Sequence, residues 1–255
     1  MDFIISANTD IGLRKKTNQD SLSVKTINTK QGKMVFAILC DGMGGLEKGE
    51  VASASVVQKF NSWVVNELPI LSEKIIEDYD IRNQWETIAK EQNEQIKNYG
   101  AKQGVKLGTT VVVMLITQTR YYVMNIGDSR AYEISNCVKQ LTKDHTFVAR
   151  EVELGNMTPE QAESDERRSV LLQCIGASEN VYPDMFFGDV NNNAVYMLCS
   201  DGFRHEITTD EMYECFNPYV LNNNNVMNEN AIRLIELNKQ RMEQDNISVI
   251  LIRTF

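Results

Sequence analysis

Four short apolar segments constrain this chain most, because each is long enough for one buried strand and far too short to span a membrane. An aspartate stands at one end of every segment. Three segments run into Asp41, Asp128 and Asp201, and Asp245 comes just before the fourth. Because strands of one sheet system can bring their ends together, we expect these four carboxylates to share a small volume.

Carboxylates at short range raise one another's pKa and destabilise a fold unless something neutralises them. A hard divalent cation would do so, and oxygen ligands favour Mg²⁺ or Mn²⁺ over zinc. Glycine follows both Asp41 and Asp201. At Gly42 the absence of a side chain would let the backbone turn sharply and aim its carbonyl at a metal. One Asp-Gly pair alone is more typical of an ordinary turn, but four strand-end aspartates together favour a metal site.

The rest of the chain alternates between strand and helix patterns. Strands are predicted at residues 3–10, 21–27, 34–40, 109–116, 121–127, 131–134, 139–142, 194–200 and 247–253. Helices are predicted at 50 to about 68, at 77–99 with Gly100 as the stop, and at 231–242, and the capping boxes Thr158/Gln161 and Thr208/Glu211 open two more. The asparagine-rich stretch 221–230 is interpreted as a loop. No linker or repeat interrupts the pattern, which indicates one α+β domain over residues 1–255 with antiparallel strand pairs.

Charge and cysteine content narrow the class of protein. The formal net charge is −9, which argues against a nucleic acid partner, since phosphate backbones need a basic face. The five cysteines show no paired spacing, so we interpret them as reduced thiols of a cytoplasmic protein. Neither a signal peptide nor an apolar run of the ~20 residues that a membrane span needs is recognisable. We expect a monomer that binds neither nucleic acid nor membrane.

Seven motifs, taken in their order along the chain, carry a more specific signal. They are TDIGLRKKTNQDS (9–21), CDGMGG (40–45), GTTVVVMLI (108–116), NIGDSRAY (125–132), LTKDHT (141–146), SDGF (200–203) and DNISVILI (245–252). With these motifs the chain resembles the bacterial, stand-alone metal-dependent protein serine/threonine phosphatases of type 2C, the PPM family. The resemblance implies a four-layer α-β-β-α sandwich in which two antiparallel sheets are flanked by helix pairs.

The resemblance also implies a set of site residues. Two Mn²⁺ or Mg²⁺ ions are expected, with a possible third. Asp41 would bridge the two ions, Gly42 would give its carbonyl to one, and Asp201 and Asp245 would ligate the other. Asp128 resembles the residue that joins Asp201 at the third, looser ion. Asp20 corresponds to an acid that orients metal-bound water, so Asp41, Asp201 and Asp20 are the expected catalytic residues.

The implied reaction is hydrolysis of phosphoserine and phosphothreonine in proteins. A hydroxide that bridges two metal ions would attack phosphorus in line, without a covalent phosphoenzyme. The implied partners are phosphorylated proteins, with a serine/threonine kinase as the opposing enzyme in signalling.

Three residues depart from the family pattern. Gln19 stands where glutamate is usual, and Met43 stands where many eukaryotic members have histidine. The arginine that grips phosphate falls at Lys15, with Arg14 beside it as the alternative, and lysine lacks the bidentate fork of arginine. Gln19 and Lys15 motivate an alternative function, namely a catalytically weak or dead relative that binds phosphoproteins.

Two further alternatives come from local motifs. A cysteine-dependent phosphatase needs an arginine six residues after its thiolate, but Arg204 lies five after Cys199, which sits in an apolar strand where a thiol has a raised pKa. A dinucleotide-binding loop would need glycine at Glu47 and no aspartate before it. Both alternatives are disfavoured.

The remaining polar residues have modest interpretations. His145 is expected to make a structural hydrogen bond and His205 to lie at the rim of the cleft, neither with a catalytic role. Arg130 and Arg204 are as consistent with ion pairs to the acidic motifs as with phosphate binding. Residues 146–180 resemble a flap beside the cleft and are a candidate for substrate selection, with one short helix predicted.

Overall fold

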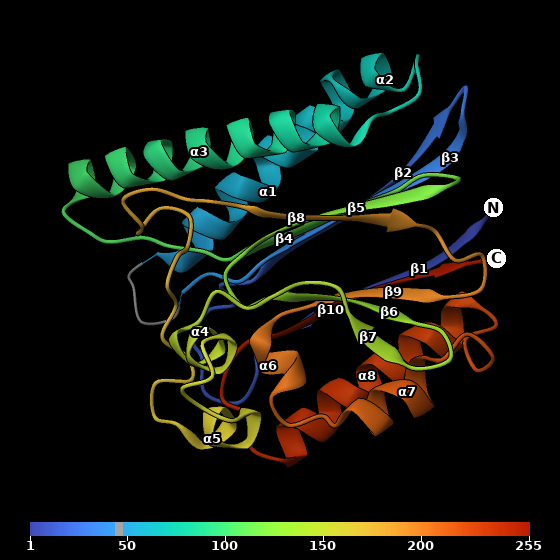
Figure 1. Cartoon of the computed structure of the whole chain (residues 1–255). Helices are drawn as coiled ribbons and strands as arrows, with labels where there is room; N and C mark the ends of the chain where they lie inside the picture. Colours follow the sequence, from blue (N-terminus) through green and yellow to red (C-terminus); the bar gives the residue numbers. More distant parts are fainter. Residues whose placement is uncertain (44–47) are drawn as a thin grey trace.

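Ten strands form two five-stranded antiparallel sheets in residues 1–43 and 48–255, the residues that the computed structural model describes (Figure 1). The first sheet has the order β1 (Phe3–Asp10), β10 (Ile247–Thr254), β9 (Val195–Cys199), β6 (Arg130–Ile134) and β7 (Val138–Gln140). The second has the order β2 (Ser21–Thr29), β3 (Gly32–Cys40), β4 (Val111–Ile116), β5 (Arg120–Ile126) and β8 (Asp184–Asp189).

Helices cover the outer face of each sheet. The second sheet is covered by α1 (Gly49–Asn66), α2 (Leu68–Leu71) and α3 (Asp78–Gln103), and the first by α6 (Asp201–Arg204), α7 (Thr209–Phe216) and α8 (Asn224–Gln240). Two short helices, α4 (Phe147–Glu153) and α5 (Pro159–Ser164), lie outside these layers at one end of the sandwich. The α+β class and the α-β-β-α sandwich are therefore confirmed. None of the described helices combines the length and the apolar character needed to cross a membrane.

Burial on both faces explains the continuous apolar runs. In β4 all six residues are buried. Val111, Val113 and Leu115 pack into the core under α1 and α3, while Val112 and Met114 pack between the two sheets. Successive side chains of a strand point to opposite faces, so a strand in the middle of this sandwich must be apolar throughout.

The strand register places the predicted aspartates at one end of the sandwich. Ser21 pairs with Cys40, so Asp20 and Asp41 are neighbours at the start of β2 and the end of β3. Cys199 pairs with both Val249 and Arg130, so the ends of β9, β10 and β6 also meet. This is the end opposite the two termini, which lie together at the right of Figure 1.

Several predicted boundaries are wrong. Helix α3 continues past Gly100 to Gln103, and Gly104, in the left-handed region, ends it. Gly100 is buried instead, and a Cβ there would lie 2.6 Å from the Val105 carbonyl oxygen. Part of the asparagine stretch is helix, because α8 begins at Asn224 and the Asn223 side chain caps it by accepting from the Val226 N–H.

Four elements were missed altogether: the one-turn helices α2 and α6, helix α4 and strand β8. Residues 146–180 contain two helices where only one was predicted. The missed one is α4, and the Thr146 side chain caps its N-terminus. Strand β8 is an edge strand whose residues are only half-buried, so it lacks the apolar run by which the other strands are recognised.

The two predicted capping boxes are confirmed, and they allow a first quantitative prediction. The Thr208 side chain accepts from the Glu211 N–H at 3.2 Å, and the Glu211 carboxylate accepts from the Thr208 N–H at 2.9 Å. Thr208→Ala is expected to cost about 1 kcal/mol of unfolding free energy, measured by urea denaturation. Thr87→Ala, on the exposed face of α3, is the matched control and should change stability by less than about 0.5 kcal/mol. Equal effects of the two substitutions would contradict the assigned cap.

Candidate functional site

Five aspartates gather where the strands of both sheets end. Asp20 precedes β2, Asp41 follows β3, Asp128 follows β5, Asp201 follows β9 and Asp245 precedes β10. Their electrostatic influence on one another shows how close they lie. Burial raises the pKa of Asp41 well above its usual range, and the charges of the other four aspartates raise it further. The strand ends that carry these carboxylates therefore lie at the same end of the sandwich.

Asp20 and Asp128, two other members of this cluster, also have raised pKa values. Burial, together with the charges of Asp201 and Asp245, raises the pKa of Asp20 to about 7. Burial and the charge of Asp201 raise the pKa of Asp128 to about 7. In the metal-free chain, protons therefore neutralise part of this cluster near neutral pH.

Unpaired oxygens in the cluster fit a cation. Asp20 Oδ1 and Asp201 Oδ1 are buried and have no hydrogen-bond donor among residues 1–43 and 48–255. A buried carboxylate oxygen without a partner destabilises a fold unless a cation or donor reaches it. In the part of the chain that the structure describes, however, no three carboxylate, imidazole or thiolate groups converge as a complete ligand set.

Lys15 occupies part of the cluster. Its Nζ atom lies 2.7 Å from Asp245 Oδ1. Burial alone would lower the pKa of Lys15, but the ion pair with Asp245 and the charges of Asp41 and Asp201 outweigh it and raise the pKa. Arg14, the alternative phosphate-binding residue, is exposed. Of the two candidates, only Lys15 lies among the aspartates.

Two threonines, to which the sequence assigned no role, hold Asp41 in position. The Asp41 N–H donates to Thr110 Oγ1 at 3.0 Å, and its carbonyl oxygen accepts from the Thr109 hydroxyl at 2.9 Å and from the Thr110 N–H at 2.8 Å. Thr110 Oγ1 is in turn 2.7 Å from Ser129 Oγ. The signal was available, because two threonines directly precede the apolar run of β4.

Close backbone packing explains both glycines that follow the aspartates. A Cβ on Gly42 would lie 2.5 Å from the Gln19 carbonyl oxygen and 2.6 Å from the Gly49 backbone. A Cβ on Gly202 would lie 2.2 Å from the Asn246 carbonyl oxygen. Gly42 is needed for this close approach, and its backbone is not in the left-handed region. At Gly202 the approach brings the start of α6 against the start of β10, and so Asp201 toward Asp245.

Serine and asparagine side chains complete the floor of the cluster. Ser248 donates its hydroxyl to Asp20 Oδ2 at 2.6 Å. Asn246 Oδ1 accepts from the Gln19 N–H at 2.9 Å, and its amide group donates to the Ile11 carbonyl oxygen at 2.9 Å. Sequence reasoning missed these roles, although both residues lie within the motif DNISVILI.

Gln19, which departs from the family pattern, has a hydrogen-bond partner in another element. Gln19 Nε2 lies 3.2 Å from Glu50 Oε2 at the start of α1. The amide therefore faces a carboxylate from another element, which returns a negative charge to the neighbourhood of Gly42. Gly44, Gly45 and Glu47, which also entered the sequence argument, lie outside the described residues.

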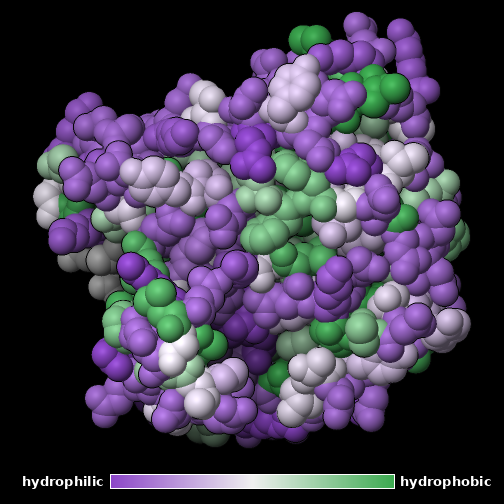
Figure 2. Space-filling model, viewed as in Figure 1, coloured by the Kyte–Doolittle hydropathy of each residue, from purple (hydrophilic) through white to green (hydrophobic). Residues whose placement is uncertain are grey.

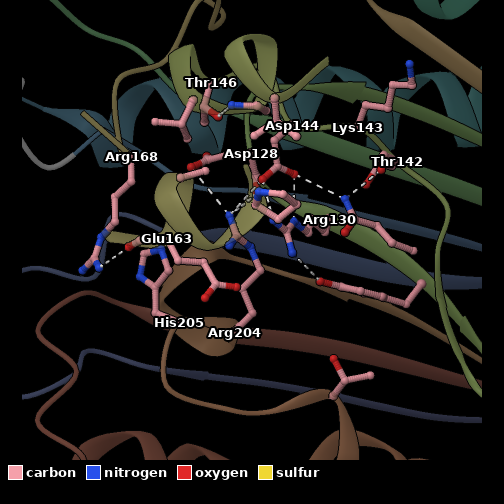
Figure 3. Close-up of a pocket in the computed structure, with 18 of the residues that line it drawn as sticks. Asp128, Arg130, Thr142, Lys143, Asp144, Thr146, Glu163, Arg168, Arg204 and His205 are labelled. Atoms are coloured by element: carbon pink, nitrogen blue, oxygen red, sulfur yellow. Dashed lines mark hydrogen bonds and ion pairs between the residues drawn. The ribbon is translucent and has the colours of Figure 1, made fainter. Parts of the chain in front are cut away.

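Arginines next to Asp128 form structural ion pairs, one of the two interpretations of the sequence. Arg130 binds Asp144 in a bidentate pair at 2.7 and 2.8 Å (Figure 3). Arg204 donates to the Asp128 carbonyl oxygen at 3.0 Å and lies 3.5 Å from Asp144 Oδ2. These arginines keep the pKa of Asp144 low in spite of its burial. The network positions the turn that carries Asp128.

A large hollow opens beside this network. It has a volume of about 910 Å³ and lies between helices α4 and α5 on one side and α6 and the start of α7 on the other. Figure 2 shows the hollow on the surface, with strongly hydrophilic residues inside it. The part of the predicted flap-like segment from Thr146 to Arg168 therefore lines one side of a cleft that reaches Asp128.

The histidines have the positions that were expected. His145 Nδ1 accepts from the Gly127 N–H at 3.2 Å, and Nε2 lies 3.2 Å from Asp184 Oδ2, so its contacts are structural. His205 lies 3.7 Å from Asp201 Oδ2 and 3.4 Å from Glu243 Oε2. Burial lowers the pKa of His205, but these two carboxylates outweigh burial and raise it.

The cysteine-dependent alternative is not supported. Cys199 is fully buried in β9, and burial raises the pKa of its thiol to about 12. Such a thiol is neither ionised nor reachable at neutral pH.

Known proteins are similar to this chain in sequence and fold. The profile of the family described as "Protein phosphatase 2C" matches residues 13–235. A putative protein phosphatase 2C-type from Streptococcus pyogenes is 31% identical over 251 residues, which cover 97% of this chain and 96% of the relative.

Solved structures agree along the full chain. The crystal structure of the serine/threonine phosphatase Stp1 from Staphylococcus aureus has a TM-score of 0.86 and 28% identity, and the match covers 100% of this chain and 96% of that one. The catalytic domain of the serine/threonine phosphatase PstP, crystallised in complex with 2 manganese ions, has a TM-score of 0.77 and 26% identity, with 99% of each chain covered.

Proposed function

Because this chain belongs to the protein phosphatase 2C family and is a serine/threonine protein phosphatase, we propose that it hydrolyses phosphoserine and phosphothreonine in proteins with two divalent cations, Mn²⁺ or Mg²⁺. Family membership confirms the resemblance inferred from the ordered motifs. The observation that carries the metal proposal is the buried carboxylate cluster, in which Asp20 and Asp201 each have an oxygen without a partner.

The proposed ligands are the residues that the motifs indicate. Asp41 is assigned to both ions and the Gly42 carbonyl to one of them. Asp201 and Asp245 are assigned to the other, and Asp128 with Asp201 to a third, weaker ion. The packing of Gly202 supports this assignment, because it brings the backbone next to Asp201 against the backbone next to Asp245.

When bound, the two cations lower the pKa of a water molecule and neutralise charge that develops on the phosphoryl oxygens. The chain's own residues supply orientation. Asp20, held through Oδ2 by Ser248, has Oδ1 free to accept a hydrogen bond from the attacking water. The attack is in line, and no residue of the chain forms a covalent phosphoenzyme.

Lys15 is proposed to bind the phosphate, with Arg14 as the alternative. A cation at Asp245 would compete with the Lys15 ammonium for the same carboxylate. The ammonium would then be free to pair with a phosphoryl oxygen, as a point charge rather than a bidentate fork.

The remaining functional expectations are proposals of the same kind. Residues 1–255 would form one catalytic domain that acts as a cytoplasmic monomer on phosphoproteins made by a serine/threonine kinase. A weak or dead relative that only binds phosphoproteins is the alternative, motivated by Gln19 and Lys15.

The test is hydrolysis of a phosphothreonine peptide by the purified chain with Mn²⁺, with Mg²⁺ and with a chelator. Activity is expected with either metal and should disappear with the chelator, because the aspartate cluster then lacks its cations. Activity that persists in the chelator would contradict the metal assignment. A folded chain that binds the peptide but hydrolyses none of it under any metal would favour the phosphoprotein-binding alternative.

A further inference from the structure

A second hollow, which we name the Leu172 groove, borders the catalytic end of the sandwich. It has a volume of about 640 Å³, and its lining combines apolar residues with polar ones: Met43, Val170, Leu172, Cys174 and Tyr182 are apolar or aromatic, and Ser169, Ser178 and Asn180 are polar. This volume is within the range of ligand-binding pockets, about 300–1,000 Å³. Among its described lining residues only Glu179 carries a charge. The described lining therefore offers contacts to an apolar side chain and offers an anion no cationic partner.

Backbone pairing connects Ile175, which follows the groove residue Cys174, to Thr109 and through it to Gly42. The Ile175 N–H donates to the Thr109 carbonyl oxygen at 2.9 Å, and the Thr109 N–H donates to the Ile175 carbonyl oxygen at 3.0 Å. Thr109 also forms a β-bridge with Gly42, and the Met43 N–H donates to the Gly108 carbonyl oxygen at 3.0 Å. The groove consequently begins one residue away from a proposed metal ligand.

The walls of the groove are fixed by Gln173. Its Nε2 atom donates to the Tyr182 carbonyl oxygen at 2.9 Å, and its Oε1 atom accepts from the Tyr182 N–H at 2.8 Å. The Leu172 N–H donates to the His145 carbonyl oxygen at 2.8 Å. Leu172 is nevertheless 45% exposed and Tyr182 71% exposed. These hydrogen bonds hold apolar side chains at the surface, which favours a partner that covers them.

We infer that the Leu172 groove binds an apolar side chain of the phosphoprotein substrate, close in sequence to the phosphorylated residue. This inference rests on the proposed function, because the phosphoryl group must sit at the aspartate cluster. Because the groove begins at Met43, directly after Gly42, and an extended peptide advances about 3.3–3.6 Å per residue, the apolar side chain lies close in sequence to the phosphoresidue. Glu179 disfavours an acidic residue at the same place in the substrate.

The test compares phosphothreonine peptides in an alanine host, with one leucine moved from four residues before to four residues after the phosphothreonine. For the wild type, kcat/KM should be about 10-fold higher at the best leucine position than for the all-alanine peptide. Leu172→Ala and Tyr182→Ala should each remove most of this preference. Leu154→Ala, an exposed leucine of the flap-like segment that does not line the groove, should keep it. Hydrolysis of p-nitrophenyl phosphate should be the same in all four proteins.

A binding measurement keeps the groove separate from catalysis. The same peptides with a non-hydrolysable phosphonate should show the same leucine preference in Kd by fluorescence anisotropy, in the Mn²⁺-loaded chain. If binding shows the preference while no peptide is hydrolysed, the groove stands and the proposed hydrolysis fails. If all peptides are hydrolysed equally, or if both groove variants keep the full preference, the groove inference is wrong and the proposed hydrolysis stands.

Discussion

Asp41→Asn is expected to abolish phosphatase activity while making the metal-free chain more stable. Removing even the outer hydrogen-bonding partners of a metal site costs about 10–100-fold in activity or affinity, so the loss of the ligand assigned to both ions should be at least about 100-fold. The gain in stability has the same origin. Asp41 is buried among four other carboxylates, and its neutral amide analogue removes that repulsion.

Two measurements check this pair of effects. One is kcat/KM for a phosphothreonine peptide with Mn²⁺, and the other is the melting temperature in a chelator. Asp189→Asn is the matched control, because Asp189 lies at the end of the edge strand β8 and pairs only with Arg120 among its described ion-pair partners. It should change neither quantity appreciably. Activity within about 10-fold of the wild type would show that Asp41 is not a ligand of the reacting centre.

The metal-free chain is expected to lose stability as the pH rises from 5 to 8, the reverse of ordinary acid denaturation. Asp20 and Asp128 have pKa values raised to about 7 in the folded chain, whereas unfolded aspartates titrate near 3.9. Between these values the folded chain holds more protons than the unfolded chain, so stability falls as the pH rises. The contribution is complete below the unfolded pKa and is lost as the pH passes the folded pKa. Each pH unit of this window is worth about 1.4 kcal/mol per group.

Urea denaturation in a chelator at several pH values measures this effect. Asp128→Asn should flatten the profile, because one of the titrating groups is then absent. The raised pKa of His205 acts in the same direction, so the difference between wild type and variant isolates the aspartate. Added Mn²⁺ should reverse the trend, since the cation competes with protons for the same carboxylates. A metal-free profile that rises from pH 5 to 8 would contradict the raised pKa values.

Much of the fold follows from local pattern. The apolar runs of β3, β4, β9 and β10 were recognised because both faces of each strand are buried, and the capping boxes because their hydrogen bonds are local. Where these signals fade, prediction failed. Strand β8 is half-buried at a sheet edge, and the asparagine run at the start of α8 was interpreted as loop although Asn223 caps a helix.

The sequence by itself determined which residues are candidates for the site. Ordered motifs named the five aspartates, Lys15 and the flap-like segment, and the apolar runs placed four of the aspartates, all but Asp20, at strand ends. Only the tertiary structure decided how they meet. Strand register and close backbone contact at Gly42 and Gly202 bring carboxylates from five strands together. The contacts around them join residues that lie far apart in the sequence, such as Ser248 and Asp20, which are 228 positions apart.

The support around the cluster and the groove beside it also belong to the tertiary structure. Thr109 and Thr110 hold Asp41, Ser248 holds Asp20, and Gln173 fixes the walls of the Leu172 groove. None of these contacts has a sequence period or spacing of its own. They arise when hydrogen-bonding groups left at the ends of strands find partners across the fold, which a pattern within one segment cannot express.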